Sequence, residues 1–109
     1  MKLIKRPWGE FKQFVLNKKC TVKILEVKPK EELSLQLHKE RTEEWYFLTP
    51  GFVQIGKNKK KVGKGKSIHI GKNIPHRIIA GNKKVLVLEI SLGNFREGDE
   101  IRLEDKYER

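Results

Sequence analysis

Short strand-like runs separated by turn residues are the feature that most constrains the fold of this chain. The runs mix β-branched and aromatic residues, and they cover residues 22–27, 33–38, 45–48, 52–55, 67–70, 77–80 and 85–92. Glycine, proline or asparagine interrupts them at residues 50–51, 56–58, 71–73 and 81–82. Many short strands with frequent turns are typical of an all-β sandwich or barrel. For residues 97–109 we expect a short helix or an irregular tail.

Length and charge limit the chain to one small, strongly basic domain. Its 109 residues suit a single domain, residues 1–109, with no room for a second catalytic one. The net charge of +11 attracts anions, whether nucleic acid, acidic membranes or phosphorylated metabolites, without choosing among them. Abundant lysine and glutamate also fit adaptation to heat.

Part of this charge is concentrated in residues 57–66, which include six lysines at positions 57, 59, 60, 61, 64 and 66. No aromatic residue interrupts this run, although binding of single-stranded nucleic acid favours such stacking platforms. We therefore expect a solvated hairpin, with a nucleic-acid patch as the weaker alternative. Gly65-Lys66-Ser67 is not a phosphate-binding P-loop, because Lys60 stands where that motif needs its first glycine.

Cysteine content and hydropathy bear on the compartment. Cys20 is the only cysteine, which excludes an intrachain disulfide, and we expect it to be a half-buried strand residue. The N-terminal residues show no signal-peptide pattern, and no apolar run approaches the roughly 20 residues that cross a bilayer. We expect a cytoplasmic protein with no membrane partner.

Four residues could hold a metal ion. Gln36 and His38 lie two apart on an expected strand, so their side chains share one face. Glu43 follows after a polar turn, and His76 begins a later strand. Imidazole, carboxylate and amide oxygen together suit zinc, manganese, iron or nickel. From spacing alone, ordinary structural roles for these residues are equally consistent.

Two longer patterns carry a family resemblance. Lys30-x5-Gln36-x-His38-x4-Glu43 resembles the first cupin motif, and Gly65-x5-Gly71-x-Asn73-x2-His76 resembles the second. Residues 33–38 (Leu-Ser-Leu-Gln-Leu-His), 41–45 (Arg-Thr-Glu-Glu-Trp) and 6–9 (Arg-Pro-Trp-Gly), with the ending at 99–109, are similar to type II mannose-6-phosphate isomerases. These usually form the C-terminal part of bifunctional mannose-1-phosphate guanylyltransferase/mannose-6-phosphate isomerase enzymes. The guanylyltransferase part has no counterpart here, so we do not expect nucleotide-sugar synthesis.

The chain departs from the general cupin motifs at five positions. Lys30, Pro50, Gly71 and Asn73 replace glycine, glycine, proline and glycine, and Ala80 stands where asparagine is usual. We expect these positions to lie at turns or beside the site, so that the fold survives them.

The resemblance implies a cupin barrel, a double-stranded β-helix of jelly-roll type, holding one divalent metal ion with Gln36, His38, Glu43 and His76. Zinc is the first choice. It implies an aldose–ketose isomerase that converts mannose 6-phosphate to fructose 6-phosphate through an enediol. The alternatives are a non-catalytic sugar- or metal-binding cupin partnering a separate nucleotidyltransferase, another metal-cupin enzyme such as a dioxygenase or epimerase, and a nucleic-acid binder.

The resemblance assigns a role to Arg41, and the reaction needs further residues that the resemblance does not identify. Arg41 would stabilise charge in the transition state, unless it only pairs with Glu40 or Glu44 at the surface. Lys66, Lys72 and Arg77 would hold the phosphate group. Glu44 and His69 are candidates for the proton-transferring base, although strand alternation should point Glu44 away from Glu43.

The large aromatic residues and the exposed sheet edges complete these expectations. We expect Trp45 and Phe47 in the core, and Trp8 to pin the N-terminal segment. A homodimer would cover exposed sheet edges.

Overall fold

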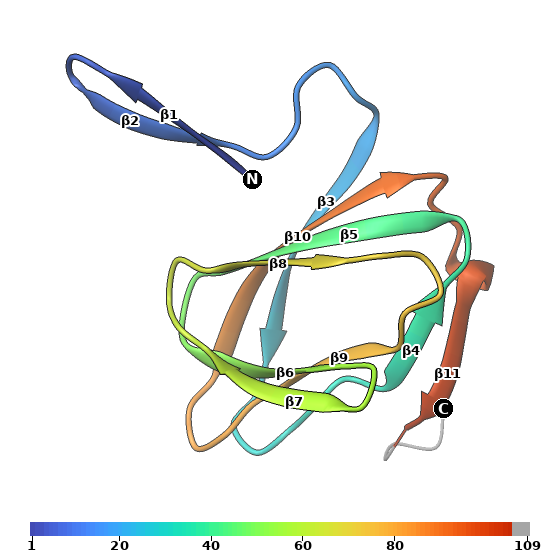
Figure 1. The fold of residues 1–109 in the computed structure, drawn as a ribbon. Helices are drawn as coiled ribbons and strands as arrows, with labels where there is room; N and C mark the ends of the chain where they lie inside the picture. The colour runs from blue at the N-terminus through green and yellow to red at the C-terminus, as the bar shows by residue number, and fades with distance from the viewer. Residues whose placement is uncertain (106–109) are drawn as a thin grey trace.

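The computed structural model describes residues 1–105, and strands make up nearly all of its regular structure (Figure 1). The elements are β1 (Lys2–Arg6), β2 (Gly9–Gln13), β3 (Cys20–Val27), β4 (Leu35–His38), β5 (Arg41–Phe47), β6 (Gly51–Ile55), β7 (Asn58–Val62), β8 (Ser67–Ile70), β9 (His76–Ile79), β10 (Val85–Gly93), the 3-10 turn η1 (Glu97–Asp99) and β11 (Glu100–Glu104). The all-β fold class predicted from the sequence is confirmed.

Two antiparallel sheets form the barrel. The first has the strand order β3-β10-β5-β8, and the second has the order β11-β4-β9-β6-β7. From β3 onward the chain passes from one sheet to the other at almost every step, and only the β6–β7 hairpin stays within one sheet. This alternation wraps the two sheets around a shared interior, as in a jelly roll. Sheet edges therefore lie at β3 and β8 in one sheet and at β11 and β7 in the other.

The core follows from the alternation of side chains along the strands. In β5 every second residue, from Arg41 to Phe47, is buried. Trp45 and Phe47 are fully buried, as predicted, and they belong to one core with Val87 of the neighbouring strand β10 and with Val53 and Ile78 of the other sheet. Along β5 the buried side chains therefore change from apolar, at Trp45 and Phe47, to charged, at Arg41 and Glu43, which marks the polar end of the barrel.

Two predictions about single side chains were wrong. Trp8 is 73% exposed and stacks on Phe11 within the β1–β2 hairpin, so it does not pin the N-terminal segment to the barrel. The hairpin forms a separate two-stranded sheet that projects from the barrel (Figure 1). Cys20 is exposed because it begins β3 at the edge of its sheet.

The chain after residue 96 is also more regular than expected. A single 3-10 turn leads into β11, which pairs with β4 from Glu100 opposite His38 to Glu104 opposite Leu35. The expected helix or tail is therefore a strand that completes the second sheet, at least up to residue 105. Residues 106–109 lie outside the described part of the chain.

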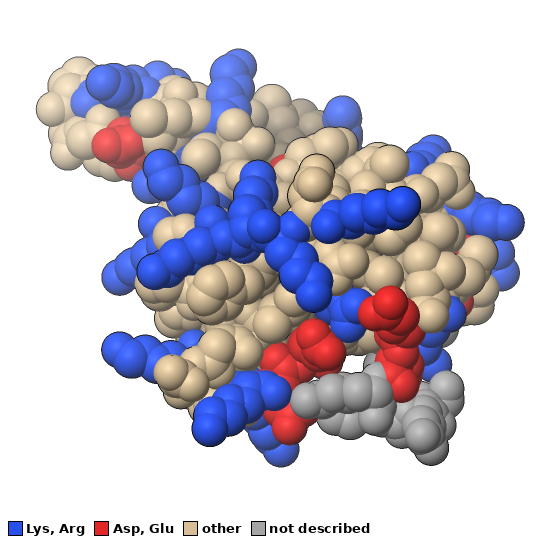
Figure 2. Space-filling model, turned by 60° about the horizontal axis from the view of Figure 1, so that its bottom comes forward, with Lys and Arg blue, Asp and Glu red and all other residues tan. Residues whose placement is uncertain are grey.

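The lysine-rich run forms the predicted solvated hairpin. β7 pairs with β6, and all six lysines between residues 57 and 66 are exposed. Figure 2 shows lysine and arginine side chains spread over one face of the molecule, with a smaller acidic group in the lower part of the view. Between residues 1 and 105, no helix is long and apolar enough to cross a membrane.

Candidate metal centre

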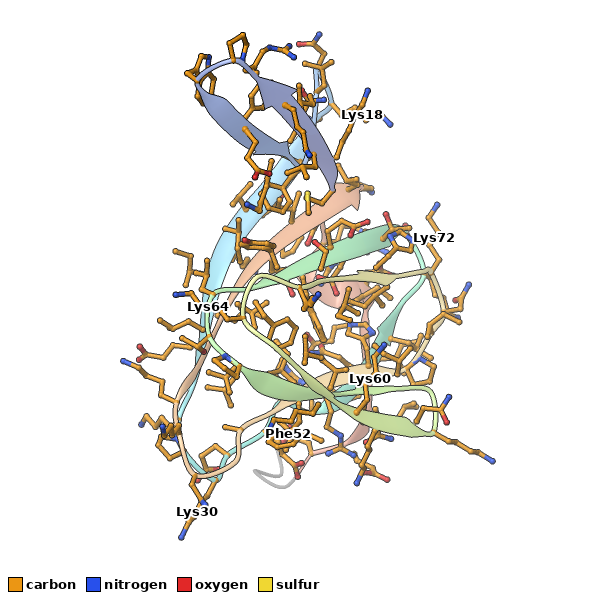
Figure 3. The ribbon with its side chains drawn as sticks, turned by 60° about the vertical axis from the view of Figure 1, so that its left-hand side comes forward. Lys18, Lys30, Phe52, Lys60, Lys64 and Lys72 are labelled. Atoms are coloured by element: carbon orange, nitrogen blue, oxygen red, sulfur yellow. The ribbon has the colours of Figure 1, made fainter. Side chains whose placement is uncertain are left out.

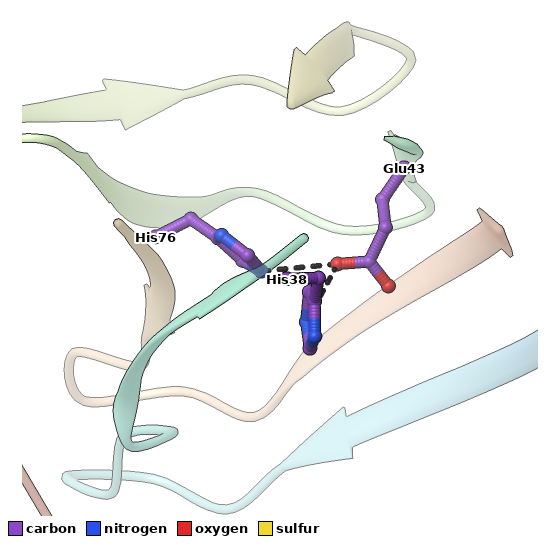
Figure 4. A group of neighbouring side chains, drawn as sticks. All are labelled: His38, Glu43 and His76. Atoms are coloured by element: carbon purple, nitrogen blue, oxygen red, sulfur yellow. Dashed lines mark ion pairs between the residues drawn. The ribbon is translucent and has the colours of Figure 1, made fainter. Parts of the chain in front are cut away.

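Three buried side chains meet inside the polar end of the barrel (Figure 4). His38 ends β4, Glu43 lies within β5 and His76 begins β9. The Oε1 atom of Glu43 lies 3.0 Å from Nε2 of His76 and 3.3 Å from Nε2 of His38. Each of the three residues is at most 3% exposed. The structure thus brings together three of the four predicted metal ligands, from three different strands.

The neighbours of His76 indicate which of its ring nitrogens is available. Its Nδ1 atom lies 2.8 Å from the carbonyl oxygen of Ile74, which can only accept a hydrogen bond. Nδ1 therefore donates to this carbonyl, which leaves Nε2 to face Glu43. Nε2 of His76 and Oε1 of Glu43 lie 3.0 Å apart, close enough for one cation to contact both.

Unpartnered atoms provide a test of whether a metal fits. Within residues 1–105, Oε1 of Gln36, Oε1 of Glu43 and Nε2 of His76 are buried without a hydrogen-bond partner. A buried polar atom without a partner costs about 1–3 kcal/mol. Gln36 pairs in register with His76, so its side chain is on the same face of the sheet. The donor set of two imidazoles, one carboxylate and one amide fits a divalent zinc, manganese, iron or nickel ion.

The carboxylate of Glu43 is held in its charged form. Burial by itself would raise its pKa, but the adjoining imidazoles of His38 and His76 outweigh burial and hold the pKa well below its usual range. The hydroxyl of Ser91 donates a hydrogen bond of 3.1 Å to the other carboxylate oxygen. Metal ligands must be deprotonated to bind, so this carboxylate is ready to do so.

Arg41 lies inside the site rather than on the surface. It is 6% exposed, with Nε 3.6 Å from Oε2 of Glu43 and one terminal nitrogen 3.3 Å from Nε2 of His38. Its guanidinium group also covers the ring of Phe95 at 4.3 Å. The alternative of a surface pair with Glu40 or Glu44 does not describe Arg41, which contacts Glu43 instead.

A cavity of about 240 Å³ adjoins this cluster on the side of His38 and Glu43. It is lined by residues of both sheets, namely Lys23, Leu25, Leu33, Ser34, Gln36, His38, Arg41, Glu43, Glu89, Phe95, Glu100 and Arg102. Edge strands β3 and β11 both contribute to it. Lys23 and Arg102 are the exposed members of this lining, so the cavity opens to solvent between the two edges.

Comparison with known families matches residues 1–105 to the family model described as mannose-6-phosphate isomerase C-terminal. The chain belongs to this family. It is 34% identical over 107 residues to the mannose-1-phosphate guanylyltransferase ManC of Salmonella typhimurium, a match that covers 95% of this chain and 22% of that protein. It is 33% identical over 108 residues to the alginate biosynthesis protein AlgA of Pseudomonas aeruginosa, with the same shares covered. The family member described here thus spans about a fifth of the length of these relatives.

Solved structures show the same fold. A protein with a double-stranded β-helix domain from Klebsiella pneumoniae aligns with a TM-score of 0.70 at 11% identity, over 84% of this chain and 80% of that one. A cupin-2 domain from Rhodospirillum rubrum aligns with a TM-score of 0.65 at 18% identity, over 80% and 64%. The predicted cupin fold is therefore confirmed.

Two of the five departures from the cupin motifs now have a conformational explanation. Lys30 and Asn73, which replace motif glycines, both adopt a positive φ of 64°. Glycine enters this left-handed region without strain, asparagine tolerates it, and lysine does so at a cost. Lys30 lies in the loop at the base of the barrel, and its side chain points away (Figure 3). As expected, the fold survives both substitutions.

Glu89 is a cavity residue that the sequence analysis missed. It is 8% exposed on β10, and Nε1 of Trp45 donates a 2.9 Å hydrogen bond to it. Burial, with the nearby Glu43 charge, raises the pKa of Glu89 to about 7. A usable signal was present, because Val85, Val87, Glu89 and Ser91 alternate inward and only Glu89 carries a charge.

Asp99 shapes the turn between two site residues. Its carboxylate accepts hydrogen bonds of 3.0 and 2.9 Å from the backbone N–H groups of Lys39 and Glu40, which separate His38 from Arg41. Burial would raise the pKa of Asp99, and these two donors lower it below its ordinary value. Asp99 therefore links the start of β11 to the metal centre.

The candidate bases and phosphate-binding residues lie outside the cavity lining. Glu44 points away from Glu43, as predicted, and pairs with the exposed His69 at 2.5 Å on the outer face. Lys66 and Lys72 are exposed on either side of β8. Arg77 is buried and donates a 3.0 Å hydrogen bond to Oε1 of Gln54. The phosphate-binding role of Lys66, Lys72 and Arg77 stays a prediction.

Proposed function

We propose that this chain is a metal-dependent aldose–ketose isomerase that interconverts mannose 6-phosphate and fructose 6-phosphate through an enediol. The observation that carries the proposal is the buried cluster of His38, Glu43 and His76, of which His38 and Glu43 line a cavity of about 240 Å³. Membership in the mannose-6-phosphate isomerase C-terminal family supports the choice of reaction.

Gln36, His38, Glu43 and His76 would hold the ion, with zinc as the first choice. When bound, a divalent metal polarises the sugar oxygens at C1 and C2 and stabilises the negative charge that develops on them. With a single carboxylate among the four ligands, the site keeps a net positive charge that suits this task.

Arg41 would contribute a second positive charge from the chain itself. Its guanidinium group lies against Glu43 and His38 and lines the same cavity, so it can orient the carboxylate and attract a negatively charged transition state. The low exposure of Arg41 strengthens both interactions, because a buried site has a lower effective dielectric constant than water.

The second candidate function is a non-catalytic sugar- or metal-binding cupin that partners a separate nucleotidyltransferase. It is favoured by the relatives named mannose-1-phosphate guanylyltransferase, of which this chain matches only 22%. Under this alternative the same cavity would bind mannose 6-phosphate without converting it.

The deciding experiment is an isomerase assay on purified chain stripped with EDTA and reloaded separately with zinc, manganese, iron or nickel. We expect fructose 6-phosphate to form from mannose 6-phosphate with at least one ion, and His76→Ala to abolish the reaction. His69→Ala is the matched control for metal content, since His69 is an exposed histidine outside the cavity. Bound metal without turnover, for every ion, would favour the non-catalytic alternative.

A further inference from the structure

The mouth of the cavity carries two cations that the isomerase proposal has not used. Lys23 lies on β3 and Arg102 on β11, the edge strands of the two different sheets. Both line the cavity and both are exposed, whereas Arg41 is buried beside the metal ligands. The positive charges therefore run from the floor of the cavity to its rim.

Strand register aims both side chains inward. Lys23 is paired with Glu89, and Arg102 is paired with Gln36, and each partner itself lines the cavity. Paired residues in an antiparallel sheet point to the same face. The pairing of β11 with β4 shifts register just after Arg102, and such irregularities commonly re-aim a side chain beside a site.

Phe95 lies between the rim and the floor. Nζ of Lys23 is 4.3 Å from the centre of its ring, and the guanidinium carbon of Arg41 is also 4.3 Å from it. Contacts of this kind hold a cation at an aromatic face. The ring therefore contacts both cations, Lys23 at the rim and Arg41 at the floor.

The carboxylates in the lining leave this rim positive. Glu43 is engaged with His38 and His76 at the floor, and Glu89 accepts a hydrogen bond from Trp45. Glu100 pairs with Arg102, with 2.6 Å between its Oε2 and Nε of the arginine. A planar guanidinium has further donors on its terminal nitrogens, so Arg102 can bind an anion while this pair persists.

We propose that Lys23 and Arg102 bind the phosphate group of the substrate at the mouth of this cavity. The inference rests on the proposed isomerase function. With C1 and C2 of the sugar at the metal ligands, the phosphate on C6 lies at the opposite end of the molecule. A cavity of about 240 Å³ is below the roughly 300–1,000 Å³ usual for drug-sized ligands, so the phosphate extends to the rim.

The rim position distinguishes this pair from the basic residues predicted on sequence alone. Lys66 and Lys72 are outside the cavity lining, and Arg77 is occupied by Gln54, Glu32 and Glu104. The two sets of residues therefore make opposite predictions for single substitutions, which allows a direct test.

The test compares Lys23→Met and Arg102→Met with Lys66→Met and Lys72→Met in the metal-loaded chain. We expect each rim substitution to raise KM for mannose 6-phosphate about tenfold or more and to weaken inhibition by inorganic phosphate similarly. Bound metal per chain should not change, and the two control substitutions should have little effect. Higher KM in the controls with unchanged KM in the rim variants would overturn the proposal.

A further variant predicts a change of opposite sign. Glu100→Gln removes a negative charge beside Arg102 that repels phosphate, so it should tighten phosphate binding, which a purely structural role of Arg102 would not do. Calorimetric titration with inorganic phosphate measures phosphate affinity directly and does not depend on isomerase activity. If the chain shows no isomerase activity but the rim variants bind phosphate more weakly, the phosphate site is supported and the isomerase proposal is rejected. Binding unaffected by these variants would reject the inference.

Discussion

Replacing Arg77 with methionine should destabilise the chain by about 2–4 kcal/mol without weakening phosphate binding. The guanidinium of Arg77 is buried and contacts Gln54 on β6, Glu32 before β4 and Glu104 at the end of β11. It therefore joins three separate parts of the second sheet. Methionine has a similar length and keeps the apolar packing of the side chain, so that the change removes mainly the polar contacts.

The magnitude follows from the burial of each partner. Gln54 is 8% exposed, and loss of the arginine leaves its Oε1 atom buried without a donor, at a cost of about 1–3 kcal/mol. Glu32 and Glu104 have 30% and 65% exposed side chains, so water replaces the arginine and each pair contributes at most about 1 kcal/mol.

Urea denaturation followed by circular dichroism measures this difference, and the midpoint should fall by about 1–2 M. The double variant Arg77→Met/Gln54→Leu should lose less stability than the two single variants lose together, because it leaves no buried Gln54 oxygen without a donor. Inhibition of the folded variant by inorganic phosphate should match the unmodified chain. Unchanged stability together with weakened phosphate inhibition would refute this reasoning and support the phosphate role predicted for Arg77.

Three further substitutions test other parts of the structure. Glu89→Gln should stabilise the metal-free chain more at pH 8 than at pH 4, by up to about 3 kcal/mol. The pKa of Glu89 is about 7 in the folded chain and 4.5 in the unfolded chain, so the unmodified protein loses stability as the pH rises through this range. Urea midpoints at pH 4 and pH 8 measure the difference. Asp99→Ala should lower stability above about pH 4, where the unmodified carboxylate is charged, and weaken metal affinity by loosening the turn beside His38; equal metal affinity would contradict the link. Lys30→Gly should raise the free energy of unfolding by about 0.5–1 kcal/mol by removing left-handed strain, whereas Lys30→Ala should not.

The strands of the barrel and most of the metal ligands could be predicted because they depend on patterns between residues close together in the sequence. Alternation within one strand put Gln36 and His38 on one face, and it separated Glu43 from Glu44. Turn residues marked where most strands end. His76 lies far along the chain from the other candidate ligands and has no local signal, so the family motifs were needed to favour it as a ligand.

The remaining parts depend on contacts between distant segments. Lys23 and Arg102 meet at one cavity only because β3 and β11 are edges of facing sheets, and no local pattern reveals which strands are edges. β11 is stabilised by pairing with β4, so its strand character is absent from its own exposed, charged sequence. The prediction for Trp8 was wrong for a similar reason, because the sequence does not distinguish an aromatic residue that stacks within its own hairpin from one that packs on the barrel.

The most direct test of the account is the metal content of the purified chain. After removal of metal with EDTA, titration with zinc or manganese should show one ion bound per chain, with a higher melting temperature in the loaded form. His76→Ala and Glu43→Ala should lose this binding, while the exposed control His69→Ala keeps it. Failure of the unmodified, folded chain to bind any divalent ion, or equal binding by His76→Ala, would contradict the central claim.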